Sequence, residues 1–336
     1  MTKKFSKDDK LTSIHHYVPQ GYLRRFSFDK NKSKVFAYEL DREPYPTNVK
    51  NVGGEKGFYN YVDLDGSKTS ELENVLAEID TRGIEVIAKL DSLKPGYVNL
   101  DEKDKQDLLT FISFLHVRNT RDRRENAEFL GEASLLQFQI LASHKEAFHK
   151  NAIEALVDTK HKYKETEIEE HRKELLEGKF KISYDPKEQY FMGQSLAKSK
   201  ELYKVLYLQK IIAICETETS RKIVTSDNPV TYYGPEGRPR NMPLGYIHAA
   251  FQMPLSPNKM LFLINNDMEL GNFKLSRKQV DYHNFFTYRF AERWVFSDTE
   301  SKIIQEMFSQ HNSREPSLKI SSPFGRSTDG MSKSQK

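Results

Sequence analysis

Apolar residues alternate or recur at helical spacing along most of the chain, and this pattern predicts its secondary structure. The segment from Ile14 to Val18 is expected to be extended, because Pro19 disfavours a helical conformation in the residue before it. Gln20 to Phe26 is predicted to form a short helix. Three segments rich in Val, Phe and Tyr are typical of strands in a small antiparallel sheet, at residues 35–40, 49–52 and 57–62.

Two long helices are predicted next. Ser70 and Glu73 are spaced as a capping box, and the apolar residues after them continue at helical spacing, with Gly83 as a weak point. Asp101 begins a second helix, whose pattern runs through an arginine-rich stretch toward Leu141. We expect this second helix to be the longest in the core.

The second half of the chain alternates between the two patterns. Strands are predicted at residues 211–215, 222–225, 247–252, 260–264 and 294–296. Helices are predicted at residues 190–210, at residues 277–292 after an N-cap at Ser276, and from an N-cap at Thr299 to His311. The fold class is therefore α+β, a mainly helical body with a mixed or antiparallel sheet from the N-terminal and C-terminal thirds.

The domain organisation follows from charge and composition. Residues 1–13 form a basic lead, and residues 14–315 are predicted to be a single elaborate domain. Charged residues are dense and apolar ones sparse at about 145–185, so we expect a charged helical insertion that is exposed to solvent. The serine-rich residues 316–336 are expected to be disordered.

Composition narrows the class of protein. The 336 residues include 21 Phe and 17 Tyr, enough for a large core, which excludes disorder along the whole chain. The single Cys215 excludes a disulfide framework and a zinc site with several thiolates, and favours a reducing, cytoplasmic compartment. No run approaches ~20 apolar residues and none resembles a secretory signal, so we expect no membrane partner.

The net charge says less than its distribution. A formal charge of +4 is too small to indicate nucleic-acid binding by itself. Residues 1–30 carry seven Lys and Arg against three Asp and Glu, and residues 316–336 carry four against one. Solubilising tails are the simpler interpretation of these basic ends.

The first candidate for a functional site begins at the two adjacent histidines. Neighbouring side chains of an extended segment point to opposite faces, so at most one of His15 and His16 faces a given pocket. That histidine can be a metal ligand or a general base, and Arg24 or Arg25 can clamp an anion bidentately. Capping and salt bridges are the structural alternative.

The second candidate continues the buried stripe of the helix that begins at Asp101. Arg118 and Asn119 are the next positions on that face, and an unpaired buried charge costs several kcal/mol. Arg118 therefore needs a partner. That partner is either a ligand or, structurally, the carboxylate of Glu73 or Glu78.

Two further candidates lie in the C-terminal part. After the strand at 222–225, Asp227 can bind a divalent cation or act as a base. Alternatively, Asp227 and Asn228 form a turn before Pro229. Asn284 lies on the inward face of its helix, so its amide needs either backbone capping or a ligand. The chain contains no Walker loop and no GxGxxG, GxSxG or HExxH motif, so the commonest nucleotide-binding and hydrolase classes are unsupported.

These segments resemble a known family. Residues 15–19 and 22–26 are similar to the HHxVP and YLRRF motifs of the bacterial family catalogued as domain of unknown function 4238, and the resemblance runs in order across roughly residues 14–297. It includes the SDNPV segment at 226–230 and the PLSP segment at 254–257. It implies an intracellular bacterial protein without a settled activity. It also groups dispersed polar residues that we expect to converge, namely His15, His16, Arg24, Arg118, Asp227, Asn228 and Asn284.

Two hypotheses follow from this grouping. The first is a metal-assisted phosphodiester hydrolase, nuclease-like, acting on nucleic acid or another anionic substrate. In it His16 (or His15) and Asp227 hold Mg²⁺ or Mn²⁺ and its bound water, while Arg24 and Arg118 stabilise charge on the phosphate. The second is a non-enzymatic binding or interaction module, in which the same groups form a buried structural network and the basic ends or charged helices contact a partner.

Overall fold

The computed structural model describes residues 14–56, 58, 61–62, 68–69, 71–156, 164–183, 188–234 and 248–312. These residues fall into two compact units. The first comprises the described residues up to Arg123 and from Glu188 onward, and the second runs from Arg124 to residue 183. The predicted basic lead, the predicted disordered tail and Ser70 lie outside the described residues.

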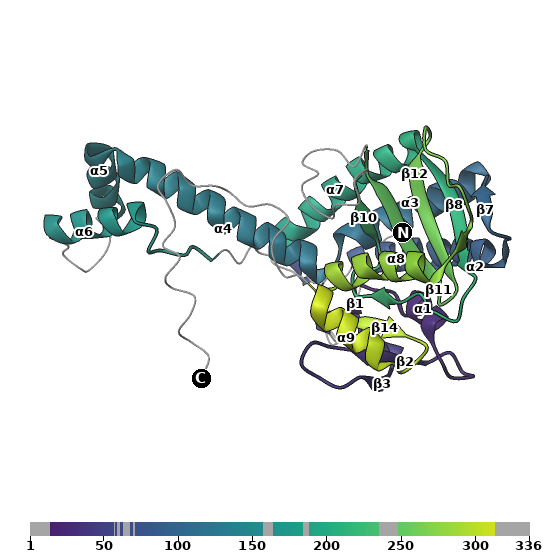
Figure 1. Ribbon diagram of the computed structural model, residues 1–336. Helices are drawn as coiled ribbons and strands as arrows, with labels where there is room; N and C mark the ends of the chain where they lie inside the picture. Colours follow the sequence, from purple (N-terminus) through teal and green to yellow (C-terminus); the bar gives the residue numbers. More distant parts are fainter. Residues whose placement is uncertain are drawn as a thin grey trace. The chain divides into compact units, whose positions relative to one another are not determined.

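A six-stranded sheet lies between helices in the first unit (Figure 1). Its strands run in the order β10-β11-β12-β8-β13, and β7 also pairs with β8. The pairing of β13 with β8 is parallel and the others are antiparallel, so the α+β fold with a mixed sheet is confirmed. The bounds are β7 Gly96–Val98, β8 Lys210–Thr217, β10 Thr231–Tyr233, β11 Ala250–Ser256, β12 Lys259–Asn265 and β13 Lys274–Leu275.

Both faces of this sheet are covered, because successive side chains of a strand point to opposite sides. In β8, Ile212 and Ile214 belong to the core shared with helices α2, α3 and α7, whereas Ala213 and Cys215 pack in a second core with Val280 of α8. Figure 1 shows α3 behind the sheet and α8 in front of it. The bounds are α2 Glu71–Ser92, α3 Glu102–Val117, α7 Glu188–Gln209 and α8 Arg277–Phe290.

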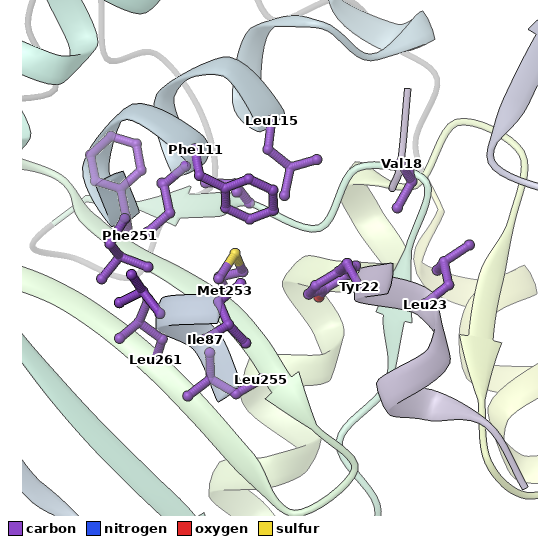
Figure 2. Close-up of a cluster of buried hydrophobic side chains, with 14 of the residues drawn as sticks. Val18, Tyr22, Leu23, Ile87, Phe111, Leu115, Phe251, Met253, Leu255 and Leu261 are labelled. Carbon is purple, nitrogen blue, oxygen red and sulfur yellow. The ribbon is translucent and has the colours of Figure 1, made fainter. Parts of the chain in front are cut away.

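The N-terminal segment is part of the larger core. After β1 (Ile14–His16), the predicted short helix is present as α1 (Gln20–Leu23) followed by the 3-10 helix η1 (Arg24–Phe26). Tyr22, Leu23 and Phe26 are fully buried. Figure 2 shows Tyr22 and Leu23 in the same cluster as Phe111 of α3 and Met253 of β11. The hydroxyl of Tyr22 donates to the carbonyl of Pro254 at 2.8 Å, so this segment ties the N-terminus to β11.

A four-stranded sheet joins the two ends of the first unit in the order β3-β2-β14-β9. The predicted strand at 49–52 is wrong: Val49–Asn51 is a 3-10 helix, η2, because the side chain of Asn48 accepts from the backbone N–H of Lys50 at 3.1 Å. The strand beside β2 is instead β3, four residues earlier. The bounds are β2 Lys34–Tyr38, β3 Tyr45–Asn48, β9 Thr225–Ser226 and β14 Val295–Ser297.

Smaller elements complete the first unit. The last helix is α9, and its N-cap is Ser301 rather than the predicted Thr299. The described parts of the segment after η2 hold two short antiparallel pairs, β1 with β4 and β5 with β6. The bounds are β4 Gly54–Lys56, β5 Tyr61–Val62, β6 Lys68–Thr69 and α9 Lys302–His311.

The helix predicted to continue from Asp101 toward Leu141 is broken in the structure. Helix α3 ends at Val117, and a separate helix α4 runs over Thr120–Ser143. The break has a local cause: the side-chain oxygen of Asn119 accepts from the backbone N–H of Asp122 at 2.8 Å, which is an N-cap contact. Arg118 and Asn119 therefore sit at a corner.

The second unit is a small helical body. It contains α4 from Arg124 onward, α5 (Lys145–Leu156) and α6 (Glu165–Leu176). Its apolar core is small, with Ala142, Phe148 and Ile168 buried. Glu169 accepts two hydrogen bonds from Arg172 and lies 3.0 Å from His149 Nε2, and these contacts lower the pKa of Glu169 to about 2. This unit begins earlier in the chain than the insertion predicted at about 145–185.

The close approach of α2 and α3 depends on Gly83, because a Cβ there would overlap the ring of Phe111. Replacing Gly83 by Ala gains ~1 kcal/mol in helix propensity, but overpacking a core costs ~1–3 kcal/mol. We expect Gly83→Ala to lower the free energy of unfolding by about 1 kcal/mol, and by at most about 2 kcal/mol, measured by urea denaturation. Gly193→Ala is the control, since nothing lies within 4 Å of its added Cβ, and it should be neutral or stabilising.

Candidate functional site

The two histidines of β1 point to opposite faces, as the extended segment predicts. His15 is buried, and its Nε2 lies 3.2 Å from the carboxylate of Glu73 on α2. His16 is half-buried, with Nε2 3.1 Å from the carbonyl of Lys50 and Nδ1 3.5 Å from the amide of Gln20. Burial lowers the pKa of His16, and the hydrogen bond to the Lys50 carbonyl opposes this.

Arg118 at the end of α3 is buried and forms an ion pair. Its Nη2 lies 2.5 Å from Oδ1 of Asp80 on α2, so the partner is neither Glu73 nor Glu78, the two predicted candidates. Burial raises the pKa of Asp80, while the charge of Arg118 and the hydrogen bond from it lower the pKa. Glu73 and Asp80 are seven residues apart and share one face of α2, so a single helix face holds both His15 and Arg118.

Asp227 binds backbone. Its Oδ1 accepts from the N–H of Glu292 at 2.9 Å, and its Oδ2 accepts from the N–H groups of Arg293 at 2.7 Å and Trp294 at 3.0 Å. The side chain is 1% exposed. Burial raises the pKa of Asp227 to about 6, and the three N–H donors oppose this shift. The carboxylate thereby shapes the turn that leads from α8 into β14.

The side chains of Asn228 and Asn284 also form hydrogen bonds with other groups of the protein. Asn228 accepts from Nδ2 of Asn119 at 3.2 Å and donates to the carbonyl of Phe290 at 3.3 Å. Asn284 on α8 accepts from the N–H of Val224 at 3.1 Å and donates to the carbonyl of Lys222 at 2.8 Å. The amide of Asn284 thus replaces a strand partner for residues 222–224. Of the two partners predicted for this amide, backbone or ligand, the structure shows backbone.

Of the two arginines after the histidines, Arg24 is exposed and Arg25 is partly buried. The Nε of Arg25 donates to the carbonyl of Leu255 at 2.6 Å, and its Nη2 lies 2.6 Å from Asp91 of α2. Arg25 therefore attaches η1 to β11 and α2. Arg24 belongs to the surface.

The structure brings part of the predicted group together. Arg118 and Asn119 are consecutive, and Asn119 contacts Asn228, the neighbour of Asp227. Tyr17, two residues after His15, is buried close enough to Asp227 that burial, and after it the Asp227 charge, raise the pKa of Tyr17. Asn119 therefore links the corner after α3 to Asn228, and His15 and Arg118 each contact a carboxylate of α2. His16 and Arg24 lie nearer the surface.

This arrangement does not fit a divalent metal at His16 and Asp227. Both oxygens of Asp227 already accept backbone hydrogen bonds, and both ring nitrogens of His16 face protein groups. Within the described part of the chain, no three His, Cys, Asp or Glu side chains are grouped so that they could hold a metal ion.

Sequence reasoning missed a buried polar pair on the other face of the sheet. The ring Nδ1 of His283 lies 2.6 Å from Oε1 of Gln252, and Nε2 of Gln252 donates to the carbonyl of His283 at 2.9 Å. Burial lowers the pKa of His283 to about 4. The rings of Phe262 and Tyr282 lie around it, with centroids 4.8 and 5.3 Å away. The signal available in the sequence was a polar residue between apolar neighbours in β11.

The fold and this site define an α+β protein whose buried polar side chains join strands and helices. Residues 14–301 match the model of the family described as protein of unknown function (DUF4238), and the chain belongs to that family. No match was found among curated proteins or among solved structures. None of the helices in the described ranges is long and apolar enough to cross a membrane.

The low pKa of His283 in the folded protein predicts that the stability of the fold decreases in acid. Its imidazole gains a proton below about pH 6.5 in the unfolded chain but only near pH 4 in the folded protein, so stability falls as the pH decreases between these values. We expect the protonation of His283 to lower the free energy of unfolding by about 2 kcal/mol between pH 7 and pH 4.5.

His283→Asn keeps a donor toward Gln252 without a titrating ring, so its stability should change less with pH than that of the wild type. Urea denaturation at pH 7 and pH 4.5 measures the difference. His144→Asn removes an exposed ring and serves as the control, with the wild-type pH dependence retained. Equal pH slopes for His283→Asn and wild type contradict the prediction.

Proposed function

We propose that this protein is a non-enzymatic binding or interaction module, in which the buried polar network is structural and recognition takes place on the surface. The observation that carries this proposal is the carboxylate of Asp227, which accepts three backbone N–H bonds. A carboxylate in that position stabilises a turn, and Asp227 is buried.

The other polar residues of the group support the same function. Asn284 and Asn228 bond main-chain atoms of neighbouring elements, and His15 and Arg118 each contact a carboxylate of α2. These contacts connect the N-terminal segment, α2, the corner between α3 and α4, and α8. Such a network explains why chemically reactive residue types occur at dispersed positions without a catalytic role.

In the metal-assisted hydrolase, His16 or His15 shares a cation with Asp227. Both oxygens of Asp227 instead accept backbone N–H bonds. Nε2 of His16 lies 3.1 Å from the Lys50 carbonyl, and Nε2 of His15 lies 3.2 Å from the Glu73 carboxylate. We therefore favour the binding module over the hydrolase. We also propose that the protein is bacterial and lies in the cytoplasm, and its single cysteine supports a reducing compartment. Cys215 is buried in the sheet, and burial raises its pKa to about 12, so it remains a reduced core residue.

Asp227→Asn tests the proposal. The amide keeps one acceptor but directs an NH₂ group at a backbone donor, so one buried N–H loses its acceptor. We expect the free energy of unfolding to fall by ~1–3 kcal/mol in urea denaturation. Asp267→Asn, at an exposed carboxylate, is the matched control and should change stability by less than ~0.5 kcal/mol.

A catalytic carboxylate behaves in the opposite way, because its replacement leaves stability unchanged or raises it. Thermal denaturation of wild type, His16→Ala and Asp227→Ala with Mg²⁺, Mn²⁺ and EDTA provides an independent test. A rise in melting temperature that is specific to one metal, and that is absent in both variants, would establish a shared metal site and reject the binding module.

A further inference from the structure

Positively charged side chains gather near the N-terminal end of β2. We define the basic turn as the exposed cations on η1, on the turn before β2, at the start of β2 and on η2, namely Arg24, Lys30, Lys32, Lys34 and Lys50. Phe28 lies within the same turn and is 41% exposed, with its ring stacked on Phe36 at a centroid distance of 4.5 Å.

Backbone hydrogen bonds bring these residues together. The N–H of Phe28 donates to the carbonyl of Lys34 at 3.0 Å, which closes the turn. The N–H of Val49 donates to the carbonyl of Ser33 at 2.9 Å and places η2 beside that turn. Because η1 precedes Phe28 by only one residue, Arg24 lies next to the same stretch. The five cations therefore form one local surface.

None of the five cations forms an ion pair with any residue that the structure describes. The one carboxylate in the turn, Asp29, accepts from the N–H and the hydroxyl of Ser33 at 2.8 Å each and from the N–H of Lys34 at 2.6 Å. Asp29 thus organises the turn and holds the lysine backbone in place.

One of the cations occupies a position that favours another residue type. Lys32 has φ of 49°, in the left-handed region where glycine and asparagine are preferred. Nothing in the described contacts of the turn needs a lysine side chain there. A charge at this position contributes to the surface and not to the fold.

We propose that the basic turn binds single-stranded nucleic acid, with the five cations on the phosphates and one base on the ring of Phe28. Clustered lysines with an exposed aromatic ring are the combination that tracks a phosphate backbone and stacks a base. This inference rests on the proposed function, since it names the partner that the binding module takes.

The test measures the binding of fluorescein-labelled dT20 and rU20 to the full chain by fluorescence anisotropy, from 50 to 300 mM NaCl. We expect wild type to bind either strand with an affinity that falls as salt rises. For single strands the slope of the logarithm of the association constant against log salt is negative, and its magnitude falls by ~0.7 for each phosphate that the protein no longer neutralises. Lys32→Gly with Lys34→Gln should therefore reduce the magnitude of the slope by about 1.4.

Lys32→Gly separates binding from folding, because glycine is favoured at that backbone conformation and should keep or raise stability while weakening binding. The matched control is Lys278→Gln with Lys302→Gln, which removes two exposed charges on α8 and α9 and should leave the slope unchanged. Phe28→Leu should weaken binding about fivefold or more without changing the slope, because it removes stacking and not charge.

Two results overturn the inference. One is wild type that does not bind either oligonucleotide at 50 mM NaCl. The other is binding that the variants of the basic turn and the control variants weaken equally. Vesicles containing phosphatidylserine are a further arm, and binding to them but not to the oligonucleotides is a case of the first result, in which the basic turn takes a membrane surface instead. Each result leaves the stability effect of Asp227→Asn intact, so failure here is distinguishable from failure of the proposed function.

Discussion

The turn between α8 and β14 exists because three backbone N–H groups converge on one buried carboxylate, that of Asp227. Removing three amide donors from water is costly unless an acceptor replaces it, and a buried carboxylate is costly unless donors surround it. Each therefore satisfies the other. The turn sets β14 between β2 and β9, so the connection of the N-terminal and C-terminal parts of the sheet depends on this contact.

The remaining polar contacts extend the same principle over the first unit. Asn228 holds the end of α8 and the corner between α3 and α4, and Asn284 holds the strand segment before β9. One face of α2 supplies carboxylates to His15 and Arg118. A residue set that includes histidine, arginine and aspartate resembles catalytic machinery by composition. In this protein these side chains contact backbone N–H groups or carboxylates of neighbouring elements.

The polar groups of the interior connect helices and strands, and the function that we propose assigns recognition to side chains outside the core. The basic turn is held in place by Asp29 and by η2, but its lysines contribute little to the fold. Charge on a rigid turn can bind a flexible polyanion at a small entropic cost to the protein, because the backbone is already ordered.

The sequence by itself determined the α+β class, most helices and strands, and the opposite orientations of His15 and His16, because these depend on local spacing. It also required that Arg118 and Asn284 have partners, since both lie on buried faces. The identity of these partners did not follow from the sequence. The packing of α2 and α8 against distant strands decided that Arg118 pairs with Asp80 and not with Glu78, and that Asn284 bonds the backbone and not a ligand. The break at Asn119 and the 3-10 helix after Asn48 depend on asparagine side chains that accept hydrogen bonds from nearby backbone N–H groups. Local sequence and tertiary packing together determine whether such a bond replaces a regular helix or strand.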